Sequence, residues 1–165
     1  MLFRSHDARI REREFLEAVR TFGLPDHYLF HRENSTVTVT EEETYCQTEG
    51  REAIRYFHSL SDPPDAVITY NALVGVSLVQ EAKQLGISIP EDLSVITIDS
   101  PNFSEYLTPQ LTAIDHPLSA MGDTGTRELI RLIRGEITEQ PFVRIMKPVL
   151  VEGGSVTDNN NRGRS

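Results

Sequence analysis

The sequence contains a single cysteine and fewer basic than acidic residues. Cys46 alone excludes an intrachain disulfide and any metal site built from several cysteines, and it fits a reducing compartment. The 16 lysines and arginines stand against 25 aspartates and glutamates, which gives a formal net charge of −9. A surface that binds nucleic acid needs excess cations to neutralise phosphates. The composition therefore argues against a general nucleic-acid-binding surface on this chain.

The sequence also lacks the usual signs of a membrane protein or an enzyme. No apolar run is long enough to span a bilayer, and the start of the chain has no apolar core of signal-peptide length, so we expect a cytoplasmic protein without membrane contact. There is no Gly-rich phosphate loop, no Gly-x-Ser-x-Gly motif and no Cys/His pair. The spacing of His27 and His31 matches helical zinc ligands, but Pro25 and the strand-like residues between them disfavour a helix. We expect no enzyme, no metal and no cofactor.

Alternating helix and strand signals run along the 165 residues, which suffice for one domain with a hydrophobic core. Apolar spacing and terminal Gly or Pro residues predict helices at 7–22, 47–60, 72–85 and 118–134. Strands are predicted at 28–31, 66–70, 94–98, 111–114 and 143–151, 36–40 is a strand or an extended loop, and 153–165 is a disordered tail. A helix between two short apolar strands predicts a right-handed βαβ unit, and hence a Rossmann-like α/β fold with a parallel sheet flanked by helices.

Two of the predicted strands are followed by polar residues. Asn71 follows strand 66–70, and Asp99 follows strand 94–98. The carboxyl ends of parallel strands lie side by side, and ligands bind in the crevice beyond them. Asn71 alone is explained as a helix N-cap and Asp99 alone as a turn residue. Together they favour an amide and a carboxylate that hydrogen-bond the hydroxyls of a small molecule.

Three other side chains are weaker candidates for such a site. Tyr70 and Phe103 could stack on the flat face of a ligand, although core packing is the commoner role of an aromatic side chain. His116 follows the short strand 111–114 in an Asp-His-Pro junction, where a histidine is usually structural or exposed and only sometimes a switch.

Four segments, in order along the chain, resemble regulators of the lactose-repressor/galactose-repressor (LacI/GalR) type. Residues 64–72 read Pro-Asp-Ala-Val-Ile-Thr-Tyr-Asn-Ala, close to the family's Pro-Asp-Ala-x-x-x-x-Asn-Asp. Residues 86–99 resemble Gly-x-x-x-Pro-x-Asp-x-x-Val-x-Gly-Phe-Asp, and 107–114 resemble Leu-Thr-Pro-Pro-Leu-Thr-Thr-Ile. Residues 11–18 resemble Arg-x-x-Gly-Phe-x-x-Ala. The four matches in register extend the resemblance over most of the chain.

The resemblance implies a periplasmic-binding-protein-like fold, in which two Rossmann-like subdomains enclose a ligand cleft. Residues 7–114 and 143–152 would form the C-terminal subdomain, and 115–142 would belong to an N-terminal subdomain. We expect the rest of that subdomain, and the helix-turn-helix domain that reads DNA, to be absent from this chain. An isolated half-cleft should bind its ligand weakly.

The positions that match the family pattern also imply a set of effector contacts. Glu14, Ala72 and Ser100 depart from the family pattern of Gly, Asp and Asp, so the identity of the effector stays open. The expected contacts are Arg11, Asn71 and Asp99, with His116 as a looser match. Beside these family positions, we expect Tyr70 or Phe103 to cover the sugar face.

The function implied by the resemblance is effector sensing without catalysis. A sugar, nucleoside or related metabolite would shift the balance between two cleft geometries of a homodimeric repressor. Operator DNA would be bound only through the domain that this chain lacks. The alternative is a periplasmic sugar-binding protein that feeds a transporter.

Overall fold

The fold is a four-stranded sheet with helices on both sides and a long arm. The computed structural model describes residues 6–24, 30, 42–99, 107–137 and 143–158. The elements in chain order are α1 (His6–Thr21), α2 (Glu42–Ser59), β1 (Ala66–Thr69), α3 (Ala72–Gln84), β2 (Ser94–Ile98), β3 (Thr112–Asp115), α4 (Leu118–Ile133) and β4 (Val149–Val151). The sheet order is β1-β2-β3-β4, with the first three strands parallel and β4 antiparallel to β3. The predicted fold class, a parallel sheet flanked by helices, is confirmed.

Two strand predictions differ from the structure. The continuously apolar sequence of 66–70 predicts a buried strand, which is wrong in its burial, because β1 lies at the edge of the sheet and Ile68 is 42% exposed. The strand predicted at 143–151 is reduced to β4, since only its last three residues reach a neighbouring strand. Residues 36–40, and all of 28–31 except Phe30, lie outside the described residues.

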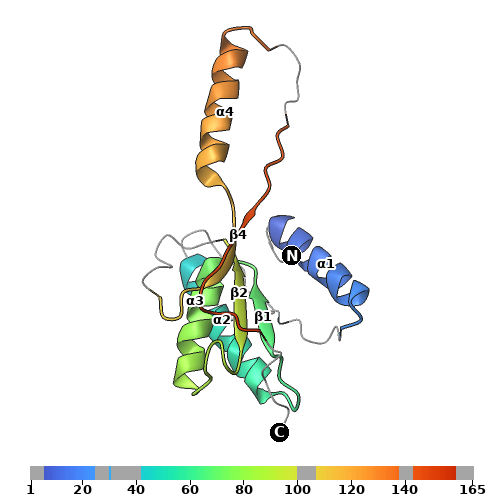
Figure 1. The fold of residues 1–165 in the computed structure, drawn as a ribbon, viewed down its shortest axis with the longest axis vertical. Coiled ribbons are helices and arrows are strands. Elements are labelled where there is room, and N and C mark those ends of the chain that lie inside the picture. The colour runs from blue at the N-terminus through green and yellow to red at the C-terminus, as the bar shows by residue number, and fades with distance from the viewer. Residues whose placement is uncertain (1–5, 25–29, 31–41, 100–106, 138–142, 159–165) are drawn as a thin grey trace.

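Helices α2 and α3 pack together against one face of the sheet, whereas α1 lies on the other side, next to β1 (Figure 1). Gly50 lets α2 approach α3 closely, because a Cβ atom there would collide with Ser77 Oγ and with the carbonyl oxygen of Val74. Between these helices and the sheet lies a core of Ile54, Leu78, Ala82, Leu93, Val95 and Leu111.

The βαβ unit brings two chain segments to one edge of the sheet. Thr69 of β1 is level with Thr97 of β2 in the parallel register. Asn71 and Asp99, two residues further along their segments, therefore leave the sheet at the same edge. This arrangement is the one that the strand pattern predicted.

The segment after β4 is held in place by hydrogen bonds. Ser155 is fully buried, and its hydroxyl donates to the carbonyl oxygen of Val95 at 2.6 Å and accepts from the N–H of Thr112 at 2.8 Å. The backbone N–H of Val95 donates to the carbonyl oxygen of Ser155 at 2.8 Å. The prediction of a disordered tail is therefore wrong for residues 153–158, because this serine joins the tail to β2 and β3; residues 159–165 lie outside the described part.

An arm extends from the same edge of the sheet as Asn71 and Asp99. Helix α4 and the extended residues 143–148 form it, and Figure 1 shows both projecting far beyond the other elements. No side chain of α4 is buried, and several of its apolar residues are largely exposed, including Leu118 at 68% and Ile133 at 77%. Among the described residues, no helix has the length and apolarity needed to cross a membrane.

Candidate functional site

Asp99 is the centre of a polar cluster at the edge of the sheet. Its side chain follows β2 and is 40% exposed. The Nε2 atom of His116, which follows β3, lies 2.9 Å from Asp99 Oδ1. The Nη1 atom of Arg11, on α1, lies 3.9 Å from Asp99 Oδ2. Three predicted site residues, from three separate elements, thus meet at one carboxylate.

The backbone at Asp99 is unusual. Its φ angle is 71°, in the left-handed region that residues other than glycine seldom occupy and that Asp tolerates better than most. The backbone N–H of Asp99 donates to the carbonyl oxygen of Ile114 at 3.0 Å, which ties this turn to β3. A local cost of this kind persists only where the surrounding structure enforces it, and such positions are concentrated at binding sites.

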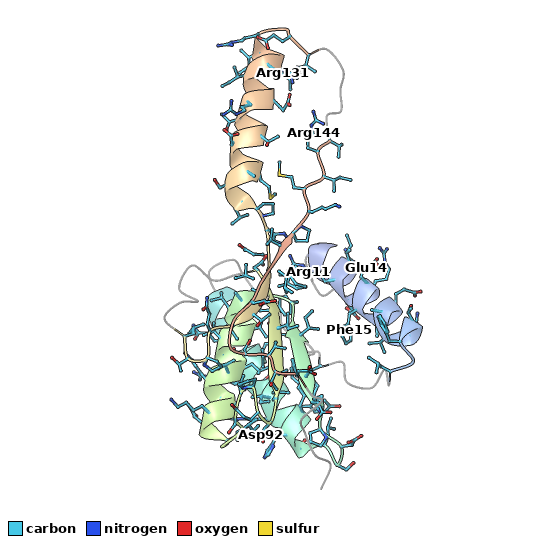
Figure 2. The ribbon with its side chains drawn as sticks, in the orientation of Figure 1. Arg11, Glu14, Phe15, Asp92, Arg131 and Arg144 are labelled. Atoms are coloured by element: carbon cyan, nitrogen blue, oxygen red, sulfur yellow. The ribbon has the colours of Figure 1, made fainter. Side chains whose placement is uncertain are left out.

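Arg11 connects α1 to the ends of two strands. Its guanidinium Nη1 donates to the carbonyl oxygen of Tyr70, and it also faces Asp99. The Arg11 side chain is only 27% exposed. In Figure 2 it reaches from α1 toward the sheet, whereas Glu14 points away from it. The departure from the family pattern at Glu14 therefore lies outside the cluster.

Asn71 takes the helix-capping position that its sequence context predicted. Its Oδ1 accepts the backbone N–H of Val74 at 2.9 Å, at the first turn of α3. Its Nδ2 donates to the sulfur of Cys46, on α2, at 3.4 Å. Asn71 is thus at the same edge as Asp99, but these two hydrogen bonds run to α2 and α3 rather than to the carboxylate cluster.

Tyr70 directs its hydroxyl into the protein. The phenol donates to Glu49 Oε2 at 2.7 Å, and its oxygen lies 3.7 Å from the sulfur of Cys46. Burial, followed by the negative charge of Glu49, raises the pKa of the Tyr70 phenol above its usual range. The structure thus anchors one end of this ring on α2, and Phe103, the other aromatic candidate, lies outside the described residues.

Sequence reasoning missed Cys46 and Glu49. Their three-residue spacing puts them on one face of α2, which is a weak signal because many helical pairs share it. Both are buried, Cys46 at 2% and Glu49 at 8% exposure. Only the packing of α2 against α3 and the end of β1 shows that they support Tyr70 and Asn71.

The exposed part of the site offers charges suited to a hydroxyl-rich molecule. The Asp99 carboxylate accepts hydrogen bonds only, whereas the guanidinium of Arg11 donates only. Carboxylates and guanidiniums form the stronger, charge-assisted hydrogen bonds. The described residues contain no group of three or more His, Cys, Asp or Glu side chains arranged to hold a metal ion.

Comparison with known proteins identifies the family of this chain. A family model described as a periplasmic binding protein-like domain matches residues 2–156. The chain belongs to this family. The resemblance predicted from four sequence segments is therefore confirmed.

The relatives within this family include transcription regulators. A probable opine utilization operon repressor from Rhizobium rhizogenes is 31% identical over 101 residues, which are 61% of this chain and 50% of the repressor. A LacI-family regulatory protein from Chloroflexus aggregans is 24% identical with a TM-score of 0.76, covering 94% of this chain and 53% of that structure. A LacI-family regulator from Arthrobacter sp. FB24 in complex with lactose is 26% identical with a TM-score of 0.62, covering 67% and 41%. The chain thus spans about half the length of these relatives.

Proposed function

We propose that this chain is the effector-sensing part of a LacI/GalR-like transcription regulator. The observation that carries the proposal is the convergence of Arg11, Asp99 and His116 at the carboxyl edge of a parallel sheet. Ligands of open α/β sheets bind at this edge. Family membership and the operon repressor among the relatives support a regulator rather than a binding protein of a transporter.

The proposed chemistry is binding of a polyhydroxylated metabolite. Asp99 accepts hydrogen bonds from one or two hydroxyls, while Arg11 and His116 hold the carboxylate in place. Asn71 donates its amide to a hydroxyl oxygen. Tyr70 or Phe103 covers the apolar face of the ligand. The lactose bound to the Arthrobacter relative supports a sugar as the ligand class.

The proposed division of the chain follows from the exposure of the arm. Residues 7–114 and 143–152 form the C-terminal subdomain, and 115–142 belong to an N-terminal subdomain that supplies the opposite wall of the cleft. A helix with an apolar stripe and no buried side chain supports this division, since such a stripe is normally covered. The effector would bind the two walls unequally in two cleft geometries and so shift their populations.

The regulator as a whole would act as a cytoplasmic homodimer without catalytic activity. Operator DNA would be bound through a separate helix-turn-helix domain, consistent with the net charge of −9 on this chain. The relatives support this assignment because their names describe regulation rather than catalysis or transport.

The proposal is tested by a thermal-shift screen of sugars and nucleosides on the longest polypeptide encoded in frame with this chain. We expect at least one compound to raise the melting temperature, because a ligand that binds only the folded state stabilises it. Asp99→Asn should abolish that shift, since an amide replaces the charged acceptor. Glu91→Gln, an exposed position in a loop of the same subdomain, is the matched control and should keep it.

Isothermal calorimetry on the 165-residue chain alone completes the test. We expect no binding tighter than millimolar for any compound that stabilises the longer polypeptide, because half of the contacts are missing. Micromolar binding to the 165-residue chain contradicts the proposal that it forms only half of the cleft. An Asp99→Asn variant that keeps the full ligand-induced rise in melting temperature contradicts the proposed site.

A further inference from the structure

A line of polar contacts runs behind the candidate site, from Asn71 to a buried carboxylate on α2. Asn71 Nδ2 lies 3.4 Å from Cys46 Sγ, which lies 3.7 Å from the Tyr70 hydroxyl, which lies 2.7 Å from Glu49 Oε2. The cysteine and the glutamate are both nearly inaccessible to solvent. The line therefore joins a predicted ligand-binding residue to groups that no ligand can reach.

The groups at the two ends of this line determine which atom donates in each hydrogen bond. A carboxylate only accepts, so the Tyr70 hydroxyl gives its hydrogen to Glu49. The tyrosine oxygen is then the acceptor for the Cys46 thiol hydrogen, and the sulfur lone pairs remain to accept from Asn71. Every hydrogen bond points the same way, toward Glu49, which is the arrangement in which neighbouring bonds polarise and strengthen one another.

The same line decides which atoms of Asn71 are left for a ligand. The amide oxygen accepts the N–H of Val74 at the start of α3, so the helix cap uses one of its two lone pairs. One amide hydrogen is directed to Cys46. Among the described residues, the second amide hydrogen meets no acceptor. Asn71 thus keeps one N–H donor for a ligand, beside the second lone pair of its amide oxygen.

We infer that Cys46 is a positioning residue that, together with the helix cap, fixes the orientation of the Asn71 amide and leaves one of its two N–H groups as the donor for a ligand. This inference rests on the proposed function, which makes Asn71 a ligand contact. The group on the ligand that meets this N–H is then an acceptor, such as a hydroxyl or ring oxygen. The amide cannot turn over without losing both the helix cap and the contact with sulfur.

The test measures the two side-chain amide hydrogens of Asn71 by NMR in the 15N-labelled chain, without any ligand. Asn71→Asp removes both signals and so assigns them, while its carboxylate keeps a cap for α3. We expect the two hydrogens to exchange with water at rates that differ roughly fivefold to tenfold, as one ordinary hydrogen bond implies. Cys46→Ala should make the two rates equal. Cys46→Ser should preserve the difference, since its hydroxyl also accepts and donates.

Gln47→Ala, at the exposed neighbouring position on α2, is the control and should leave both rates as they are. Equal exchange rates in the unmodified chain, or a Cys46→Ala variant that keeps the difference, overturn the positioning role. A Cys46→Ser variant that behaves like Cys46→Ala also overturns it, because packing alone then orders the amide. No ligand enters these measurements, so their result is independent of the outcome of the sugar screen.

Discussion

At the scale of single residues, Asp99 carries both the charge of the candidate site and a backbone cost. Its φ angle of 71° disfavours any side chain with a Cβ, and its carboxylate is held by His116 and Arg11. The carboxylate contacts groups outside β2, namely His116 after β3 and Arg11 on α1. We therefore expect substitutions at Asp99 to separate the effect of its charge from the cost of its backbone conformation.

Asp99→Gly should be more stable than Asp99→Ala by about 1 kcal/mol, measured by urea denaturation of the 165-residue chain. Both variants lose the carboxylate, so their difference reports the backbone alone. Glycine avoids the steric cost of the left-handed backbone conformation, about 1–2 kcal/mol. Part of this gain in stability is lost, because glycine also gives the unfolded chain more conformational freedom. Equal stability of the two variants, or greater stability of the alanine variant, contradicts a backbone cost at this position.

At the scale of elements, the crossing of α2 and α3 determines the geometry behind the site. This crossing brings Cys46 and Glu49 to the end of β1, and a second contact secures it, because the Ser77 hydroxyl donates to the carbonyl oxygen of Cys46 at 3.2 Å. On the outer part of the same pair of helices, Arg55 Nη2 lies 2.6 Å from the buried carboxylate of Glu81. The absence of a side chain at Gly50 is what allows this approach.

Gly50→Ala should destabilise the chain by about 1–3 kcal/mol, because the new methyl group meets backbone atoms of α3 that cannot move aside. Gly125→Ala is the matched control, since a Cβ atom there meets open space on α4. It should leave stability unchanged or raise it by at most about 1 kcal/mol through helix propensity. Chemical denaturation of both variants checks this, and equal effects at the two glycines argue against a tight α2–α3 contact.

At the scale of the whole molecule, the arm is exposed to solvent, whereas the sheet packs against the hydrophobic core. Helix α4 buries none of its side chains, although a stripe of apolar residues runs along it. Its charged residues are already paired with one another, for example Asp123 with Arg127 at 2.8 Å. The surface left for a partner is therefore the apolar one, as the proposed N-terminal subdomain requires.

Hydrogen–deuterium exchange of the 165-residue chain should separate the arm from the rest. We expect the amides of α4 to exchange far faster than those of α3, because a 16-residue helix that packs against no other described helix or strand is marginally stable in water. The amides of β2, between two strands, should exchange slowest. Slow exchange throughout α4 indicates instead that another polypeptide covers the arm in solution, and dilution of the sample then shows whether that polypeptide is a second copy.

The sequence by itself determined the fold class, the order of most elements and the edge of the sheet where the site lies. These depend on local signals, such as the apolar strands, Gly86 after α3 and the polar residues Asn71 and Asp99, which report the conformation of nearby residues directly. Arg11 was placed at this site only through the family resemblance, whereas the position of His116 after a predicted strand already made it a candidate.

The tertiary structure alone decided which groups support the site and which segments are held in place. Cys46 contacts Asn71 because two helices cross at a glycine, and Ser155 is buried because the chain returns from the arm to β2 and β3. Both contacts join residues far apart in the sequence, through distances that no local pattern encodes. The sequence around a serine in a polar tail does not show that the serine is buried. Its burial is explained only by the groups that satisfy its hydrogen bonds in the folded chain.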